Sequence, residues 1–352
     1  MMKNNCLTSI KVNASKSYEV LVGQDILQNT GEFISGILPK CKVAIITDDI
    51  VDKLYAKVVE NSLIEQGYSV VKFVFKNGEK SKNINTYSKI LNFLAKNQLT
   101  RTDLVVALGG GVVGDISGFV SATYLRGIKC VQIPTTLLSQ IDSSVGGKTA
   151  IDLPSGKNLV GAFFQPSLVI CDCKILSSLP KEQFDCGLGE MLKYAILDKN
   201  IYSSFIEDNF DLTKLVSLCI EYKKKIVELD EFENSARKLL NLGHTMAHGI
   251  EKLSKYSISH GKAVSLGLKI IVDNSLKHGY LAREEYDKIT CLITKVLGEE
   301  QNIYPIKKLC KVSLSDKKRS GENITLVMVY GIGDCKLVKV NINELWGYLT
   351  WK

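Results

Sequence analysis

The feature that most constrains the fold is an apolar run that ends in glycines and continues as a helix. Residues 103–108 read DLVVAL and residues 109–115 read GGGVVGD. Gly109, Gly111 and Gly114 satisfy G-x-G-x-x-G between a predicted strand and a predicted helix, the context in which this pattern is informative. Such glycines let the backbone approach a pyrophosphate, whose charge the helix N-terminus stabilises. The stretch predicts a dinucleotide site on an α/β sheet.

The flanking sequence alternates buried-strand and helix patterns in the same way. Residues 10–22 predict a pair of strands, and the further strands and helices follow in turn at residues 42–49, 51–66, 70–75, 86–97, 116–124, 129–134 and 168–172. Alternation of this kind is typical of a parallel sheet. From about residue 180 the periodicity is helical almost to the end. We therefore expect a Rossmann-like α/β domain over 1–180 and a mainly α-helical domain over 181–352.

The acidic partner of the glycine loop has an unusual position. A Rossmann acid normally follows its glycines by about twenty residues, whereas here the candidate, Asp48, lies upstream at the end of strand 42–48. A carboxylate there suits ribose hydroxyls, and a plain helix cap explains it equally well. Thr135 and Thr136 at the end of strand 129–134 also suit a nucleotide. These positions predict dinucleotide binding by a variant arrangement.

Residues 139–163 are expected to form a long irregular segment. They hold Asp142, Lys148, Lys157 and Asn158 among glycines and serines, and loops of this length inside a domain are usually functional. The segment is not a phosphate-binding P-loop, because that motif requires a glycine where Asp142 stands.

Three of the four histidines lie between residues 244 and 260. His244 and His248 share one face of a predicted helix, and His260 follows after a turn. Imidazoles with a carboxylate typically bind zinc, so the cluster is a candidate metal site, with core and surface histidines as the alternative. Thr245 excludes the HExxH motif, so the carboxylate must come from elsewhere. Taken alone, Glu190 and Lys193 predict only a surface salt bridge.

Composition narrows the partners and the compartment. The net charge is +8 with basic residues spread along the chain, which favours an anionic small molecule over nucleic acid. The ten cysteines include no CxxC pair, which predicts reduced thiols in the cytoplasm. We find no signal-peptide pattern and no membrane-spanning apolar run, so we expect a soluble protein without a membrane partner.

Several stretches together resemble one family along nearly the whole chain. They are GGGVVGDISGFVSATYLRG, PTTLLSQIDSSVGGKTAIDLPSGKN, GLGEMLKYAI, LNLGHTMAHGIE and SHGKAV. Their combination and order resemble the 3-dehydroquinate synthases. This resemblance implies bound NAD, a divalent zinc or cobalt ion, a homodimer, and a second domain that binds metal and substrate. It implies conversion of the anionic sugar phosphate 3-deoxy-D-arabino-heptulosonate 7-phosphate into 3-dehydroquinate and phosphate, in the shikimate pathway.

The resemblance also implies roles for individual residues. The metal ligands are Glu190, His244 and His260. His248, nominated as a ligand by spacing alone, becomes a residue near the metal or the substrate. The residues implied for NAD are Asp48, Asn77, Gly78, Glu79, Lys80, Ser81, Lys82, Gly111, Val112, Val113, Gly114, Asp115, Thr135, Thr136, Lys148, Lys157, Ile175, Leu176, Ser177 and Ser178. The residues implied for substrate and catalysis are Arg126, Asp142, Lys148, Asn158, Glu190, Lys193, Lys223, Arg237, Asn241, His248, Lys317 and Lys318.

Two positions depart from the family pattern. Lys262 stands where the family commonly has glutamate, and Asn77 where an aspartate is frequent. A glutamate at 262 would be a candidate partner of a metal ligand, so its replacement bears on metal affinity. The rival functions are another sugar-phosphate cyclase, a metal-dependent alcohol or glycerol dehydrogenase, and a nucleotide-binding protein without activity.

Overall fold

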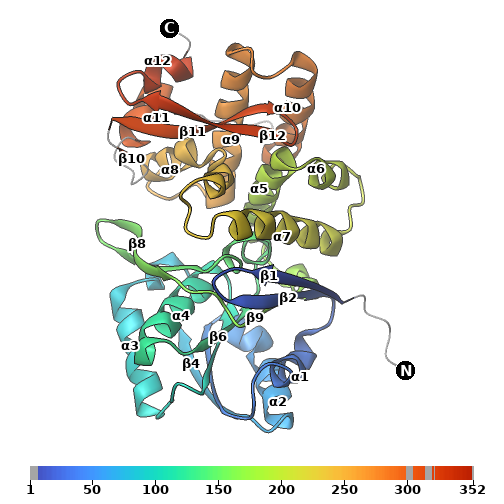
Figure 1. Cartoon of the computed structure of the whole chain (residues 1–352), viewed down its shortest axis with the longest axis vertical. Helices are drawn as coiled ribbons and strands as arrows, with labels where there is room; N and C mark the ends of the chain where they lie inside the picture. The colour runs from blue at the N-terminus through green and yellow to red at the C-terminus, as the bar shows by residue number, and fades with distance from the viewer. Residues whose placement is uncertain (1–6, 299–303, 314–318, 321, 351–352) are drawn as a thin grey trace. The chain divides into compact units, whose positions relative to one another are not determined.

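The computed structural model describes residues 7–298, 304–313, 319–320 and 322–350 (Figure 1). The chain forms two compact units. The first comprises the chain up to Leu179 together with Leu212–Glu231, and the second comprises Pro180–Asp211 and the chain from Phe232 onward. Helix α7 (Leu212–Leu229) lies beyond the expected domain boundary at 180 but packs within the first unit. The boundary itself stays a prediction.

The first unit is built on a seven-stranded sheet in the order β1-β2-β9-β6-β5-β3-β4. β1 and β2 are antiparallel, and every other neighbouring pair is parallel. This confirms the expected parallel sheet and the expected opening strand pair. The strand bounds are β1 (Thr8–Asn13), β2 (Ser17–Gly23), β3 (Lys42–Asp48), β4 (Ser69–Phe75), β5 (Leu104–Gly109), β6 (Lys129–Pro134) and β9 (Leu168–Asp172).

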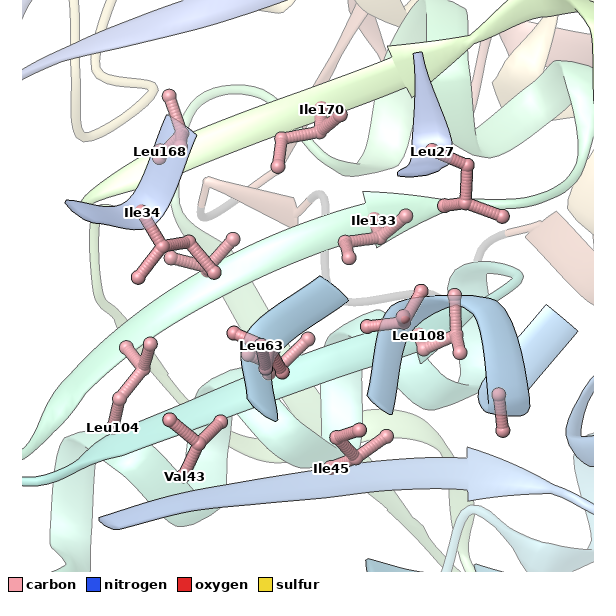
Figure 2. Close-up of a cluster of buried hydrophobic side chains, with 14 of the residues drawn as sticks. Leu27, Ile34, Val43, Ile45, Leu63, Leu104, Leu108, Ile133, Leu168 and Ile170 are labelled. Carbon is pink, nitrogen blue, oxygen red and sulfur yellow. The ribbon is translucent and has the colours of Figure 1, made fainter. Parts of the chain in front are cut away.

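Apolar side chains on both faces of this sheet are buried, which explains why its central strands read as uninterrupted hydrophobic runs. Along β3, Val43 and Ile45 join a core with helices α1 (Thr30–Ser35) and α2 (Lys57–Glu65), drawn in Figure 2. Ala44 and Ile46 join a second core with α3 (Ile84–Lys96) and α4 (Gly111–Thr123). The two cores hold the sheet between layers of helices.

The strand order reverses between β3 and β5, because β4 follows on one side of β3 whereas β6 follows on the far side of β5. Ligands of open α/β sheets bind at such a switch point, outside the carboxyl ends of the strands. Asp48 ends β3 and Gly109 ends β5, so both predicted cofactor positions flank it.

The expectation of a long irregular segment at residues 139–163 is wrong. A π-helical turn covers Ser139–Ser143, and β7 (Lys148–Leu153) and β8 (Gly156–Phe163) pair as an antiparallel hairpin. Two glycines, two lysines and the Pro154-Ser155 turn give the hairpin the composition of a loop. Ile151 anchors it, because this side chain is fully buried in the core beside α4.

The second unit is mainly helical, as expected, and also contains a small sheet in the order β10-β11-β12. Its elements are α5 (Lys181–Leu197), α6 (Lys199–Phe205), α8 (His244–Leu253), α9 (His260–Lys277), α10 (Arg283–Leu297), α11 (Ile306–Ser313), β10 (Arg319–Ser320), β11 (Asn323–Gly331), β12 (Asp334–Asn341) and α12 (Leu345–Thr350). α5 begins at Lys181, directly after Pro180. Among the described residues, none of the helices has the length and apolarity needed to cross a bilayer.

Candidate functional site

The three predicted metal ligands converge in the second unit. Glu190 lies within α5, His244 is the first residue of α8, and His260 is the first residue of α9. Glu190 Oε1 lies 3.1 Å from His244 Nε2 and 3.0 Å from His260 Nε2. Among the described residues, these three form a group whose ligand atoms all lie within 4.8 Å of one another.

Glycines explain how α5 and α9 bring Glu190 and His260 together. A Cβ placed on Gly189 would lie 2.2 Å from the carbonyl oxygen of Gly261, and a Cβ on Gly261 would lie 2.0 Å from that of Cys186. The two backbones therefore touch at positions where no side chain fits. The ligands are the next residue along α5 and the preceding residue on α9, so the helix crossing sets their separation.

The outer nitrogens of both imidazoles face oxygen acceptors. His244 Nδ1 donates to the Leu242 carbonyl at 3.1 Å, because a carbonyl oxygen can only accept. His260 Nδ1 lies 3.4 Å from Glu251 Oε1. With a proton on each Nδ1, both Nε2 lone pairs point at the carboxylate of Glu190. Two imidazoles and one carboxylate this close together suit a cation such as zinc.

The titration of these groups follows from burial and charge. Burial opposes ionisation of Glu190, but Lys193 and the two imidazoles hold its pKa well below 4.5. Burial lowers the pKa of His244 to about 4. For His260 the lowering by burial is outweighed by hydrogen bonds to Glu190 and Glu251, so its pKa rises to about 10. Without an ion, a proton on His260 Nε2 therefore occupies the position between His260 and Glu190 that a cation would take.

Lys193 is a buried neighbour of the triad, so the surface salt bridge expected from spacing alone is wrong. Lys193 and Glu190 are both 1% exposed, and Lys193 Nζ lies 2.7 Å from Glu190 Oε2. His248 lies one turn after His244, and its ring meets that of His244 edge-on at a centroid distance of 5.9 Å. His248 thus borders the cluster without belonging to the three ligands.

Two further predicted substrate residues lie in the 3₁₀ segment Ala236–Asn241, which precedes α8. Arg237 is 1% exposed. Asn241 donates from its side-chain amide to Glu233 Oε1 at 2.6 Å. Glu233 itself has a left-handed backbone with φ 62°, a strained conformation of the kind that concentrates at functional sites.

In the first unit, the N-terminus of α4 is a candidate anion site. Its N-cap residue is Gly110, which has no side chain to satisfy the first amides of the helix. Close approach limits the size of residue 110, because a Cβ there would lie 2.9 Å from Thr136 Cγ2. Val112, Val113, Gly114 and Asp115 follow within the first turns of the helix. Glycine backbone and unpaired amides suit a pyrophosphate.

A buried polar cluster lies beside this helix. Lys82 is 4% exposed and bonds through Nζ to Asp115 and, at 2.6 Å, to Asn158 Oδ1. Burial lowers the pKa of Lys82, but Asp115, Glu79 and Asp152 outweigh it, so the net shift is upward and the ammonium stays charged. Asn158 has a left-handed backbone with φ 53°. The Lys82 ammonium therefore contacts both Asp115, a residue predicted for NAD, and Asn158, a residue predicted for substrate.

The loop from Asn77 to Lys82 is fixed by hydrogen bonds of its backbone. The Asn77 amide donates to Asp49 Oδ1 at 2.8 Å, and Lys82 accepts at its carbonyl from the Asp152 amide at 2.8 Å. Glu79 pairs with Lys157 at 3.6 Å. Gly78, Lys80 and Ser81 complete the turn, and Ser81 Oγ donates to the Lys76 carbonyl.

The Asp48 carboxylate holds the turn that leads from β3 into the next helix. Its Oδ1 accepts from the amides of Ile50 at 2.9 Å and Val51 at 3.0 Å. Thr135 is held by its amide to the Gly109 carbonyl at 3.0 Å, and Thr136 Oγ1 lies 2.8 Å from Ser139 Oγ. These contacts leave the ribose role of Asp48 a prediction.

Helix α7 brings Lys223 onto Asp142. Lys223 Nζ lies 3.0 Å from Asp142 Oδ1 and donates to the Asp142 carbonyl at 2.6 Å.

The other predicted residues lie on separate elements. The 3₁₀ segment η6 (Cys173–Ser178) carries Ile175, Leu176, Ser177 and Ser178. Tyr55 holds the end of this segment, because its hydroxyl donates to Ser178 Oγ at 2.5 Å. Lys148 begins β7 and Arg126 ends an exposed turn with φ 67°. Lys317 and Lys318 lie outside the described residues.

The sequence patterns missed two acidic residues. Asp152 accepts a hydrogen bond from the Asn158 amide at 2.7 Å, and its charge helps to raise the pKa of Lys82. Its signal is the turn-forming stretch DLPSGKN, which predicts a tight turn between two strands. Glu251 contacts His260, and its signal is a carboxylate seven residues after His244, two turns along the same helix face.

Comparison with known proteins gives one consistent family. Residues 72–186 match the family model described as 3-dehydroquinate synthase N-terminal, and residues 187–319 match 3-dehydroquinate synthase C-terminal. A 3-dehydroquinate synthase of Clostridium acetobutylicum is 42% identical over 343 residues, covering 95% of this chain and 96% of its own.

Solved structures agree in fold at lower identity. A 2-deoxy-scyllo-inosose synthase complexed with carbaglucose-6-phosphate, NAD⁺ and Co²⁺ has a TM-score of 0.84 at 22% identity, covering 97% of this chain and 99% of its own. A 2-epi-5-epi-valiolone synthase from Streptomyces hygroscopicus subsp. jinggangensis, with NAD⁺ and Zn²⁺ bound, has a TM-score of 0.83 at 22% identity, covering 97% and 98%. Both show that this chain has the sugar-phosphate cyclase fold.

Proposed function

Because the chain belongs to the 3-dehydroquinate synthase family, we propose that it converts 3-deoxy-D-arabino-heptulosonate 7-phosphate into 3-dehydroquinate and phosphate. The reaction class is a carbon–oxygen lyase. The reaction combines a transient oxidation, loss of phosphate, re-reduction and intramolecular aldol closure. The observation that carries the proposal is the convergence of Glu190, His244 and His260 on one point in the second unit.

We propose NAD in the first unit and one zinc or cobalt ion in the second. The uncapped N-terminus of α4 supports the first, and the cluster of three acceptor atoms supports the second. When bound, NAD takes up and returns a hydride while the metal ion polarises a substrate hydroxyl. In this proposal Glu190, His244 and His260 hold the ion, and the crossing of α5 and α9 supports their separation.

The cationic side chains hold the substrate's phosphate and carboxylate in this proposal. Lys223 is buried and already paired with a carboxylate, so its ammonium is fixed in place before substrate binds. Arg237 presents a buried guanidinium, a group that matches carboxylate and phosphate geometry. Preset charges position the substrate and reduce the entropy lost in reaching the transition state.

Proton transfer falls to the substrate phosphate or to His248 in this proposal. Loss of phosphate needs a proton removed from the carbon beside the transient ketone. His248 lies next to His244 and is half-buried, a position from which an imidazole can relay charge.

We propose a homodimer in the cytoplasm, acting in aromatic amino acid biosynthesis through the shikimate pathway, with no nucleic-acid or membrane partner. Light scattering on the purified chain checks the oligomeric state.

The test is phosphate release from the heptulosonate phosphate with NAD, before and after treatment with a chelator. We expect release without net NADH absorbance, loss of release with chelator, and recovery on adding zinc or cobalt. A His244→Ala variant should lose activity by more than about 100-fold, as expected for loss of a metal ligand. Lasting accumulation of NADH would instead indicate a dehydrogenase, and release that ignores the chelator would contradict the metal role.

A further inference from the structure

Glu251 is a buried carboxylate with no place among the predicted site residues. It lies in α8, seven residues after His244, so the two occupy the same helix face. Its side chain is 8% exposed, and Oε1 lies 3.4 Å from His260 Nδ1. A carboxylate buried this deeply requires a partner of opposite charge or a hydrogen-bond donor. The imidazole of His260 offers an N–H at that position.

The connection between Glu251 and His260 is short and tightly held. Lys255 and Tyr256 both have left-handed backbones, with φ 53° and 62°. The Tyr256 amide donates to the Glu251 carbonyl at 2.8 Å, and Ser254 Oγ donates to the same carbonyl at 3.0 Å. Two adjacent non-glycine residues in this region are strained, and such strain persists only where the surrounding structure enforces it. The turn sets the approach of the ring to the carboxylate.

The neighbouring position that departs from the family pattern does not supply this contact. Lys262 is exposed on the first turn of α9. Among the described residues, the carboxylate that faces the outer nitrogen of His260 comes from α8. The contact therefore does not depend on the residue at position 262.

We propose that Glu251 is a positioning residue for the metal site. Its carboxylate accepts the Nδ1 proton of His260, which fixes the tautomer and turns the Nε2 lone pair toward Glu190. It also places a negative charge one ring away from the cation, which makes the imidazole a stronger donor. The inference rests on the proposed metal site and adds a residue that acts through a ligand.

Metal affinity tests the proposal without reference to turnover. The full-length chain and its variants are stripped with a chelator and titrated with zinc against a chromophoric competitor, and the visible spectrum is recorded with cobalt. Glu251→Leu removes the acceptor, and Glu251→Gln keeps an amide oxygen but loses the charge. We expect affinity to fall about 10- to 100-fold in Glu251→Leu and by less in Glu251→Gln, with a changed cobalt spectrum in both.

Glu182→Gln is the matched control, because Glu182 is an exposed carboxylate in the same unit. It should leave affinity and spectrum unchanged. Affinity in Glu251→Leu within twofold of the parent chain, with an unchanged cobalt spectrum, would overturn the inference. If Glu251→Leu does not fold, Glu251→Gln decides by the same two measurements. A parent chain that binds neither metal would refute the proposed metal site instead.

Discussion

At the scale of single residues, burial and charge shift the pKa values of the two imidazoles in opposite directions. Glu190 carries a negative charge, the pKa of His244 lies at about 4, and that of His260 at about 10. Near neutral pH, His260 is therefore the protonated member, placed between Glu190 and Glu251. A bound cation must displace that proton, since a ligating Nε2 is neutral.

This predicts a specific coupling between metal and protons. Near pH 8, binding of zinc should release about one proton, and affinity should rise roughly tenfold per pH unit until pH nears the pKa of His260, at about 10. Calorimetric titration in two buffers of different ionisation enthalpy measures the number of protons released per zinc ion bound. No proton release would show that His260 is neutral in the metal-free chain.

The same pKa predicts how the metal-free chain responds to pH. The folded pKa of His260, about 10, exceeds its ordinary value of 6.5. A group with a raised folded pKa contributes fully below the unfolded value and loses its contribution as pH rises through the folded one. The free energy of unfolding of the metal-free chain should therefore fall between about pH 6.5 and 10. His260→Gln should flatten this slope in urea titrations.

Residue identity alone predicted part of this site. The crowding of His244, His248 and His260 indicates a metal, and the spacing of four favours His248 as a ligand, as helix geometry dictates. In the structure His260 joins His244 because the close contact at Gly261 carries the start of α9 to α5. A contact between helices distant in sequence has no periodic signal. Family resemblance supplied what spacing could not.

At the scale of elements, one buried carboxylate organises the carboxyl end of β9. Asp172 is 1% exposed and accepts from the amides of Asp25, Ile26, Leu27 and Lys174 at 2.9–3.0 Å. It thereby fixes the loop after β2 and the start of η6. Asp172→Ala would leave buried amides unpaired and should lower the free energy of unfolding by about 3 kcal/mol or more. Urea unfolding measures it, with Asp208→Ala as control, since the Asp208 side chain is 98% exposed.

The crossing of α5 and α9 gives a second prediction at this scale. Gly189→Ala places a methyl group against the Gly261 backbone, which cannot move aside as a side chain can. We expect zinc affinity to fall by at least about tenfold, because the helices that carry Glu190 and His260 must separate. Gly36→Ala is the control, since the nearest atom to its Cβ would be 3.4 Å away. Unchanged affinity in Gly189→Ala would show that the crossing does not set the site.

Elements with strong periodicity were predictable, and those with mixed composition were not. The strands of the parallel sheet are buried on both faces and read as plain apolar runs. The β7–β8 hairpin was expected to be irregular because polar and glycine residues occupy half of its positions, and its pairing is visible only in the structure, where it packs beside α4. Gly189 resembles a helix breaker in the sequence, whereas within α5 it serves close packing against Gly261.

At the scale of the whole molecule, the two candidate sites belong to different compact units. We predict that zinc slows hydrogen exchange in peptides from α5, α8 and α9, whereas NAD slows it at the start of α4 and in residues 77–83. Binding stabilises the structure that forms each site, so protection should follow that division. The His244→Ala variant should lose the zinc effect and keep the NAD effect. Zinc protection confined to the first unit would contradict the assignment.

The chain passes between its units three times, after Leu179, Asp211 and Glu231, because α7 returns to the first unit. Buried side chains of α7, including Leu215, Val216 and Ile220, complete the first unit's interior. During synthesis the sheet therefore lacks this cover until residue 231 has left the ribosome. While α5 and α6 of the second unit are synthesised, apolar surface of the sheet stays exposed and accessible to chaperones. A chain truncated at residue 180 would lack α7 and would keep this apolar surface exposed.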